Sequence, residues 1–397
     1  MAFLKDIIEK PLTGEWGTDG NEVNVLRTTN FTNSGILDFS NVVKRNISEK
    51  KVEQKKLLKG DIIIEKSGGS PKQPVGRVVF FNEEGVYLCN NFTSILRPKK
   101  EKVEPKYLHY LLYASHRFGV TGMFQNKTTG IINLQLPRYV NKLEIPLPAL
   151  KTQQHIAQIL DDASALRDKT KKLLKEYDLL AKSLFLEMFG DPVINPKRWE
   201  KKALKDFLIN VKNGITRRPK TKEDESGDVV LKLKHVRSNF INYDCENKIL
   251  LNDLEKQKFR INTGDLLFIR VNGNPNYVGR CALHNDENYE VFFNDHIMRV
   301  RYDKTKYNGQ FLCLYLNYPY GQREISKRVK TSAGQHTINQ GGLEKLNLIL
   351  PPINLQNKFA EKIDLIEQQK ELAKQELQES EDLFNCLLQK AFKGELV

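Results

Sequence analysis

The sequence predicts an α+β protein with two similar mixed α/β domains, whose sheets are mainly antiparallel and twisted. Two long helices separate the domains and form an antiparallel coiled coil within the chain. Internal repeats carry this prediction. GDIIIEKSGG at residues 60–69 returns as GDLLFIRVNG at 264–273. KLEIPLP at 142–148 returns as KLNLILPP at 345–352, and a long helical pattern follows each copy. Solenoids repeat about every 20–50 residues, so a period near half of the chain indicates two copies of one fold.

The first repeat contains short runs of β-branched and aromatic residues that alternate with turns marked by Gly, Asn and Pro. This pattern is typical of β-strands. We expect strands at residues 23–31, 61–66, 75–81 and 87–97. Residues 106–119 have apolar residues at helical spacing and end on a glycine, which predicts a helix with a glycine C-cap.

The second repeat has the same order of elements. We expect strands at residues 229–236, 265–271, 277–283 and 291–301, and a helix near 310–318. Each repeat therefore predicts one mixed α/β domain.

Two segments predict the long helices. The run from Thr152 to Gly190 has no Gly or Pro before its last residue, and neither does the run from Asn354 to Lys393. The expected division is residues 1–150 for the first domain, 151–190 for the central helix, 191–352 for the second domain and 353–397 for the C-terminal helix. A helix of about 38 residues is roughly 57 Å long.

Apolar residues in both helices recur at steps of three and four, which predicts coiled-coil packing. Arg167 interrupts the first seam, and Lys370 and Ser380 interrupt the second. Because both helices belong to one chain, we expect them to pair with each other, and chain order makes that pair antiparallel. The expected seam residues are Leu160, Ala163, Leu174, Tyr177, Leu184, Ile363, Ile366, Leu377, Phe384 and Leu387.

The formal net charge of +14 lies in the two repeats. Residues 1–150 carry 22 basic and 15 acidic side chains, a net +7, and residues 191–352 carry 28 and 19, a net +9. Residues 151–190 are net +1, with 7 and 6, and residues 353–397 are net −3, with 6 and 9. Basic globular domains indicate that a polyanion binds to the domains rather than to the helices.

The cysteine pattern and the N-terminus predict a cytoplasmic protein. The five cysteines form no CxxC pair, which argues against a disulfide framework or a structural zinc site. The N-terminal MAFLKDIIEK has acidic residues and no apolar core, so we do not expect a signal peptide. No apolar run approaches the ~18 residues of a membrane span.

The sequence motifs predict no catalytic residue, metal site or cofactor in this chain. There is no GxxxxGK[ST] or GxGxxG motif, and the histidines show no HxH or HExxH spacing. NPNY at 274–277 is similar to the NPPY motif of amino-methyltransferases, but Asn276 replaces the second proline and no glycine-rich cofactor loop accompanies it. We expect Glu65 to be an outward-facing strand residue rather than part of a nuclease site, because Ile269 occupies its place in the second repeat.

Polar loops in matching places of both repeats predict a binding surface for DNA. Arg suits guanine, and Asn or Gln suits adenine, because each can form two hydrogen bonds to that base edge. Lys, Ser and Thr suit phosphates. The candidate DNA-binding residues are Arg27, Thr28, Asn30, Lys66, Ser70, Lys72, Gln73, Arg77, Lys127, Thr128, Arg217, Arg218, Lys232, Lys234, Arg270, Asn272, Asn274, Asn276, Tyr277, Arg280, Gln335 and His336.

Two stretches, one from LPALKTQQHIAQILDD to SLFLEMFGDPVINPKRWEKKALKDF (147–207) and one from LPPINLQNKFAEKIDLIEQQK to LLQKAFKGEL (350–396), resemble the specificity subunits of type I restriction–modification systems. The resemblance covers essentially the full length of the chain. The N-terminal GEWGTDGNEVNVLRTTNF is similar to the start of a target-recognition domain of that family.

The resemblance implies a non-catalytic subunit with two target-recognition domains, each of which reads one half of a bipartite, asymmetric site in double-stranded DNA. It implies that the helix pair sets the spacing and docks two methyltransferase subunits, with two restriction–motor subunits outside. S-adenosylmethionine, ATP and magnesium would then belong to the partners. From the helix length we expect half-site centres about 10–15 bp apart. A fused adenine methyltransferase and a protein-binding adaptor remain the alternative functions.

Overall fold

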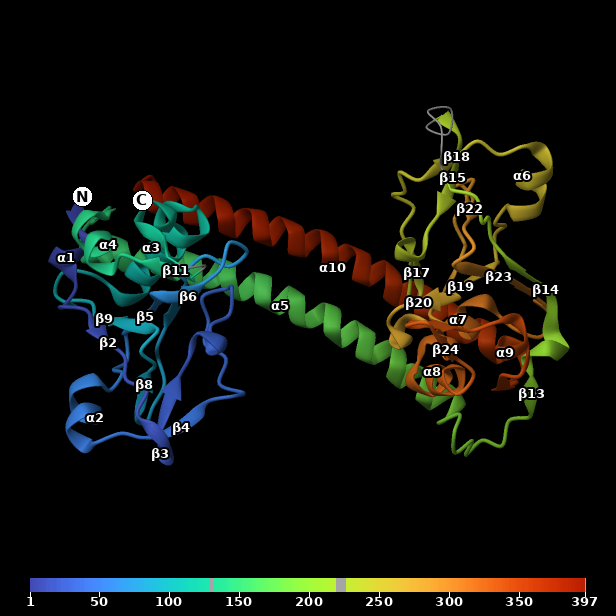
Figure 1. Cartoon of the computed structure of the whole chain (residues 1–397), viewed down its shortest axis with the longest axis horizontal. Coiled ribbons are helices and arrows are strands. Elements are labelled where there is room, and N and C mark those ends of the chain that lie inside the picture. The colour runs from blue at the N-terminus through green and yellow to red at the C-terminus, as the bar shows by residue number, and fades with distance from the viewer. Residues whose placement is uncertain (129–130, 219–225, 397) are drawn as a thin grey trace. The chain divides into compact units, whose positions relative to one another are not determined.

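The structure, a computed structural model, describes the chain except residues 129–130, 219–225 and 397. The side chains of Lys127 and Thr128 also lie outside the described part. The fold is the expected mixed α/β architecture with two long helices (Figure 1).

The chain divides into two compact units. Unit 1 comprises Met1–Leu173 and Ala373–Val397, and unit 2 comprises Leu174–Leu372. The boundary crosses both long helices, α5 (Leu150–Phe189) and α10 (Ile353–Lys393). Each unit therefore contains one repeat, part of α5 and part of α10.

The described residues of unit 1 form four small sheets, with strand orders β2-β9-β5-β7, β4-β3-β8, β10-β11-β6 and β1-β12. All described pairs in them are antiparallel except β3 with β8. The strands are β1 (Ala2–Phe3), β2 (Leu12–Thr13), β3 (Thr18–Leu26), β4 (Val43–Asn46), β5 (Ile62–Glu65), β6 (Ser67–Gly69), β7 (Val78–Phe80), β8 (Tyr87–Cys89), β9 (Thr93–Leu96), β10 (Gln125–Thr128), β11 (Ile131–Leu134) and β12 (Glu144–Ile145). The helices, including 3-10 turns labelled η, are α1 (Leu4–Ile7), η1 (Thr28–Asn30), α2 (Glu49–Lys55), α3 (Pro105–Arg117), η2 (Val120–Phe124) and α4 (Leu136–Lys142).

Unit 2 repeats this topology, with strand orders β14-β23-β19-β21, β18-β15-β22, β20-β25-β24 and β13-β26, and adds the pair β16-β17. Its parallel pair, β15 with β22, corresponds to β3 with β8. The strands are β13 (Lys201–Ala203), β14 (Leu208–Asn213), β15 (Asp228–Leu231), β16 (Val236–Arg237), β17 (Phe240–Ile241), β18 (Lys248–Ile249), β19 (Leu266–Ile269), β20 (Val271–Asn272), β21 (Cys281–Leu283), β22 (Phe292–Phe293), β23 (Ile297–Tyr302), β24 (Lys330–Ser332), β25 (Gln335–Thr337) and β26 (Asn347–Ile349). The helices are η3 (Leu204–Phe207), η5 (Leu233–His235), α6 (Asp253–Phe259), η6 (Pro275–Tyr277), α7 (Gly309–Asn317), α8 (Pro319–Ser326) and α9 (Gln340–Glu344).

Several long strands expected from the sequence are each broken into two elements, at matching places in both units. The expected strand at 87–97 is β8 and β9, and the one at 291–301 is β22 and β23. At each break an asparagine N–H donates to a carbonyl of another strand: Asn90 to Leu26 at 2.9 Å and Asn294 to Leu231 at 3.0 Å. The chain there leaves one sheet and enters another, which alternation of apolar residues cannot reveal.

The repeated Gly-Asp pair is a structural turn. Gly60 and Gly264 have φ angles of 97° and 89°, which favour glycine. The following aspartate accepts a backbone N–H from three residues earlier in both units, at 2.8 Å. It also forms an ion pair with an arginine: Asp61 with Arg97, which directly follows β9, and Asp265 with Arg301 of β23.

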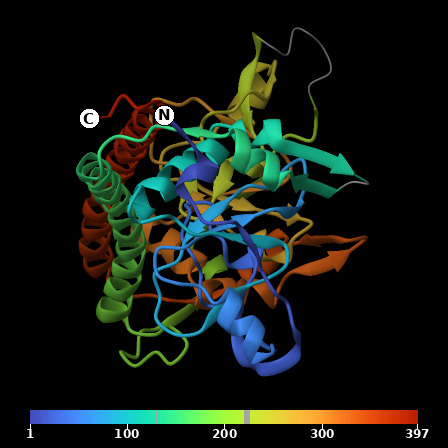
Figure 2. The ribbon, with the colours of Figure 1, turned by 90° about the vertical axis from the view of Figure 1, so that its left-hand side faces the viewer.

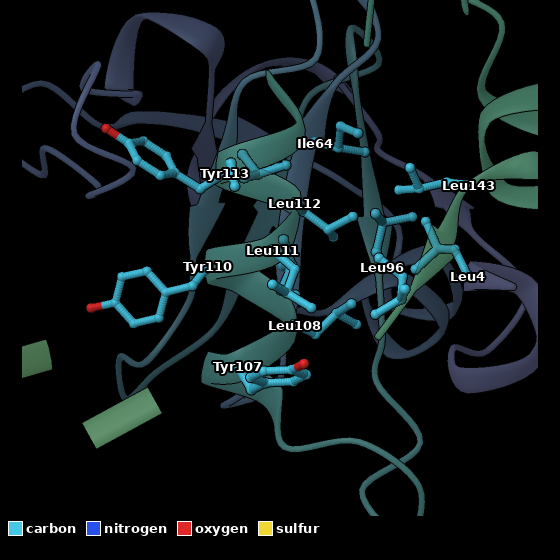
Figure 3. Close-up of a cluster of buried hydrophobic side chains, with 14 of the residues drawn as sticks. Leu4, Ile64, Leu96, Tyr107, Leu108, Tyr110, Leu111, Leu112, Tyr113 and Leu143 are labelled. Carbon is cyan, nitrogen blue, oxygen red and sulfur yellow. The ribbon is translucent and has the colours of Figure 1, made fainter. Parts of the chain in front are cut away.

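The core of unit 1 lies between α3 and the four-stranded sheet. Figure 3 shows Leu108, Leu111 and Leu112 pointing from α3 toward Ile64 and Leu96, and all five belong to one buried cluster. Tyr110 and Tyr113 point away from the sheet in the same view. Their rings lie 6.2 and 6.4 Å from that of Phe384 on α10.

The two long helices pair in an antiparallel manner within each unit. In unit 1 the start of α5 and the end of α10 run side by side (Figure 2) and share a buried cluster with the domain. In unit 2 the end of α5 and the start of α10 do the same, and Phe185 and Phe189 pack on Phe311 and Phe359. Each domain is thus held by the beginning of one long helix and the end of the other.

The expected seam residues differ in burial. Leu160, Ala163, Ile363, Ile366 and Phe384 are buried. Half-buried are Leu174, Tyr177, Leu184, Leu377 and Leu387, and the neighbouring Leu388 is the fully buried residue at the end of α10.

The polar interruptions of the seam are accommodated without a buried, unpaired charge. The Arg167 guanidinium lies 4.8 Å from the centre of the Phe384 ring and contacts Asp168 at 3.0 Å. Lys370 forms ion pairs with Asp178 at 2.9 Å and Glu367 at 2.8 Å.

A buried glutamine fastens the start of each long helix to its domain. The Gln153 side chain donates to Pro148 O and accepts the Glu104 N–H. The Gln356 side chain donates to Pro351 O at 2.8 Å and to Lys306 O at 3.0 Å, and accepts the Asn308 N–H at 2.9 Å. These bonds explain why the repeated proline-rich segment precedes each helix.

We expect Gln356→Ala to lower the free energy of unfolding of unit 2 by about 1–3 kcal/mol, because it leaves buried backbone groups without partners. Urea unfolding would be followed by Trp199 fluorescence in a chain carrying Trp16→Phe, since Trp199 lies in unit 2 and donates to Phe189 O. The control is Gln368→Ala, an exposed glutamine of the same helix, with an expected change within about 0.5 kcal/mol. Equal destabilisation by both variants would contradict this role.

Candidate nucleic-acid interface

In each unit, a three-stranded sheet joins two polar loops that are far apart in the sequence. In unit 1 the strand β6 pairs with β11 of the β10–β11 hairpin. In unit 2 the strand β20 pairs with β25 of the β24–β25 hairpin. The segment after the Gly-Asp strand and the hairpin before α4 or α9 therefore form one surface feature. Backbone pairing within the three-stranded sheet fixes the orientation of both loops. The two loops of each unit together form a candidate DNA-binding surface.

The loop after β6 forms a tight turn in unit 1. Ser70 and Gln73 bond to each other through their backbones, at 2.9 and 3.0 Å, and the exposed Lys72 lies at the tip. Ser70 and Gln73 line a hollow of about 530 Å³ together with Thr28 and Arg77. The structure thus brings four of the expected DNA-binding residues to one concave site.

The turn η1 borders this hollow. Arg27 precedes it, and its N–H donates to Asn30 Oδ1 at 2.8 Å. The Asn30 amide donates to the carbonyls of Asp38 and Asn41, at 2.9 and 3.1 Å, and the residue is only 2% exposed. Asn30 therefore shapes the turn, and the expectation that it contacts DNA is corrected.

Arg77 and Glu65 require corrections as well. Both are buried, and the guanidinium donates to the carboxylate through two nitrogens, at 2.9 and 3.1 Å. Two more bonds, to Phe31 O and Thr28 O, occupy Arg77 further. These four bonds leave the guanidinium one of its five N–H groups, so it cannot form the two hydrogen bonds that reading a guanine edge requires. Glu65 points inward rather than outward because Arg77 compensates its charge.

Of the remaining candidates of unit 1, Lys66 does not line the hollow. Lys66 donates to Thr13 Oγ1 at 3.0 Å, and burial lowers the pKa of this lysine. The backbone of Lys127 and Thr128 lies in β10, next to the hairpin end. The expectation for their side chains concerns atoms outside the described part of the chain.

In unit 2 the corresponding loop, between β20 and β21, is ordered by hydrogen bonds of its own asparagine side chains. The Asn272 side chain accepts the Asn274 N–H at 2.9 Å, and the Asn274 side chain accepts the Asn276 N–H at 3.0 Å. Tyr277 is 39% exposed, and the Arg280 guanidinium lies 4.1 Å from the centre of its ring. This loop presents an ordered polar surface.

The turn η5 corresponds to η1. The Lys232 N–H donates to His235 Nδ1 at 3.0 Å, as that of Arg27 does to Asn30. Lys232 is half-buried and Lys234 is exposed. The two turns thus place a cation at the same position of each unit.

Other candidates of unit 2 separate into two groups. Arg218 and Arg270 both bind Asp295, through its carboxylate at 2.8 Å and its carbonyl at 3.0 Å. Arg217 instead faces α6, where it bonds to Leu250 O and Glu255.

At the β24–β25 hairpin, the exposed Gln335 pairs with Ser332. The His336 Nδ1 lies 2.9 Å from Thr331 Oγ1. The turn between the strands consists of Ala333 and Gly334, both with positive φ.

A cationic cluster of unit 2 was missed from the sequence. Lys212 of β14 pairs in register with Arg299 of β23, and Lys258 of α6 lies close to both. Burial lowers the pKa of Lys212, and the cations of Lys258 and Arg299 lower it further. Lys212, Lys258 and Arg217 line a hollow of about 740 Å³. Basic residues on two strands and a helix give no local sequence signal, because only the fold brings them together.

No group of three or more His, Cys, Asp or Glu side chains in the described part of the chain is arranged to hold a metal ion. No helix among the described residues has both the length and the apolar character needed to cross a membrane.

Comparisons with known proteins agree on one family. The family model "Type I restriction modification DNA specificity domain" matches residues 3–176 and 196–381. The type I restriction enzyme StySPI specificity subunit of Salmonella potsdam is 28% identical over 94% of this chain and 82% of its own length. The EcoKI specificity subunit of Escherichia coli (strain K12) is 25% identical with the same coverage. The crystal structure of the S subunit of a type I restriction–modification system from M. genitalium matches with a TM-score of 0.59 and 14% identity, over 98% of this chain and 95% of that one. At that identity the likeness concerns the fold.

We expect Arg77→Ala to lower the free energy of unfolding of unit 1 by about 3–5 kcal/mol, because it leaves the Glu65 carboxylate buried without a partner. Trp16 fluorescence in a Trp199→Phe chain would report urea unfolding of unit 1. The matched control is Arg280→Ala in a Trp16→Phe chain, followed by Trp199 fluorescence, with an expected change in unit 2 within about 1 kcal/mol, since Ile269 stands where unit 1 has Glu65. A small effect of Arg77→Ala would contradict the structural role of the pair.

Proposed function

The chain belongs to the family of type I restriction–modification DNA specificity domains, and on that premise we propose that it is the specificity subunit of such a complex. Each unit reads one half of a bipartite DNA site, and the long helices set the distance between the halves. The chain itself carries no catalytic residue. The observation that supports this most directly is the repeated three-stranded sheet, which presents polar loops on two domains of net positive charge.

The exposed lysines and the ordered loops contact different parts of the DNA. Exposed lysines such as Lys72 and Lys234 contact phosphates, and they fix the position of the protein on the duplex without reading sequence. Side chains on the ordered loops, such as Gln73 and Asn276, reach base edges in the major groove, where every base pair has its own pattern of donors and acceptors. Two separate domains then read two short sequences with an unread gap.

The partners are two methyltransferase subunits, docked on the long helices, with two restriction–motor subunits outside them. Large apolar side chains are exposed on the helices: Leu166 and Leu383 in unit 1, and Leu179, Leu180 and Leu372 in unit 2. Exposed apolar side chains along a helix are suited to a protein partner. Because each unit has the start of one helix and the end of the other, the same kind of docking face is offered twice, which fits two copies of one partner.

The partners supply the chemistry. S-adenosylmethionine belongs to the methyltransferase subunits, and ATP and magnesium belong to the restriction–motor subunits. The substrate is chromosomal and invading DNA, so the complex acts in the cytoplasm.

When this chain is co-expressed with the methyltransferase subunit encoded beside it, we expect methylated adenines at a single motif with two short defined parts around a fixed gap. Single-molecule sequencing of the host genome would identify the motif. A continuous, ungapped motif would contradict reading by two separate domains. A stable complex without methylation would support a protein-binding adaptor instead.

The spacing role predicts that longer helices widen the gap. Four residues inserted into both helices at the boundary of the units, after Leu173 and after Leu372, lengthen each by about 6 Å and add a rotation of roughly 40°. We expect the gap in the motif to grow by about 1–3 bp while both half-sites stay the same. Lys175→Ala, an exposed substitution at unchanged length, is the control. An unchanged gap in a complex that still methylates would refute the spacing role.

A further inference from the structure

Each unit has an arginine at the same backbone position, Arg77 in unit 1 and Arg280 in unit 2. The surroundings of the two side chains are very different. The carbonyl of Arg77 accepts the N–H of Glu65, and the carbonyl of Arg280 accepts the N–H of Ile269, both at 2.9 Å. A glycine with positive φ precedes each arginine. The strand register is therefore the same, and the difference between the two arginines comes from their side-chain neighbours.

In unit 1 the neighbour is an acid. The Glu65 carboxylate binds the Arg77 guanidinium through two nitrogens, and carbonyls of Phe31 and Thr28 complete its hydrogen bonding. The side chain is 9% exposed. Arg77 is therefore a buried structural residue of unit 1.

In unit 2 the neighbour is an isoleucine, so no carboxylate draws the arginine inward. Arg280 is half-buried, and its guanidinium stacks on the Tyr277 ring at 4.1 Å. Its Nε donates to Asn276 O at 3.0 Å. No residue in the described part of the chain accepts a hydrogen bond from its two terminal nitrogens.

The loop that holds Arg280 is ordered by its own asparagines. The N–H of Asn274 and that of Asn276 each bind the side chain of the asparagine two residues earlier. Asn276 in turn supplies the carbonyl for the guanidinium, and Tyr277 supplies the surface on which it lies. Both the plane and the direction of the guanidinium are thus set before a ligand arrives, which reduces the entropy lost on binding.

We propose that Arg280 reads a guanine in the half-site bound by unit 2, with its two terminal nitrogens donating to guanine O6 and N7. The inference rests on the proposed function and adds the base and the residue. With Nε already bonded, the guanidinium presents its end, where two parallel N–H groups match the two acceptors that guanine offers in the major groove. Unit 1 has Glu65 where unit 2 has Ile269. This difference leaves the Arg280 guanidinium available to DNA, whereas that of Arg77 is bound to a carboxylate. The two half-sites therefore differ in chemistry although the two domains share a fold.

The alternative ligand for the Arg280 guanidinium is a DNA phosphate. Substitution of this arginine by lysine distinguishes a guanine contact from a phosphate contact. Lysine keeps the charge and supports a phosphate contact, but it lacks the planar fork that binds two acceptors at once. Arg280→Lys, Arg280→Ala and Lys72→Ala, a change in unit 1, form the variant set. Each would be purified as the complex with its methyltransferase subunits and checked for an unchanged melting temperature.

The assay measures methylation of duplexes in which each base pair of the wild-type motif is substituted in turn. We expect Arg280→Lys and Arg280→Ala to lose discrimination at one G·C pair, by roughly 5- to 150-fold, in one half-site only. Lys72→Ala should reduce methylation of all duplexes alike. If Arg280→Lys keeps full discrimination, or if no position of the motif responds to either variant, the inference is wrong while the proposed function stands. If the wild-type complex itself shows no two-part motif, both are overturned.

Discussion

Each unit depends on the burial of two antiparallel helix segments against one short helix of its domain. In unit 1 that helix is α3, whose Tyr110 and Tyr113 meet Phe384 of α10, while the Tyr110 hydroxyl donates to Asp161 of α5 at 2.8 Å. In unit 2 it is α7, whose Phe311 ring packs against Phe189 of α5 and Phe359 of α10, with ring centres 4.7 and 6.3 Å away. Burying one such aromatic side chain contributes about 1.5–3 kcal/mol. Neither a domain nor a helix segment could bury these faces alone, so domain and helices stabilise each other.

The residues that repeat along the chain and those that differ have separate roles. The Gly-Asp turns, the Asp–Arg pairs and the buried glutamines Gln153 and Gln356 recur with the same bonds in both units, and all of them support the fold. The candidate interface is where the units diverge, as at Glu65 and Ile269. A scaffold that is used twice leaves its loops free to differ, which is what two unlike half-sites require.

Much of the architecture could be predicted because it depends on local patterns. Steps of three and four placed the long helices within a few residues of α5 and α10, and Gly190 and Gly394 end them in the left-handed conformation that favours glycine. The candidate site was predictable only in part. Its loops could be found because they repeat, but the joining of each pair into one three-stranded sheet depends on strand pairing across about 60 residues.

The twofold repetition, the basic domains and the helix pair follow from the amino-acid sequence alone, because repeats, charge and periodicity are properties of the chain. Which polar side chains face outward depends on the folded arrangement of the chain. Arg77 and Arg280 follow the same Val-Gly motif and cannot be told apart locally. One is bound to a carboxylate twelve residues earlier, and the other rests on a tyrosine three residues earlier. A buried charge must be compensated and an exposed one need not be, so the neighbours in space determine whether an arginine supports the fold or is available to a ligand.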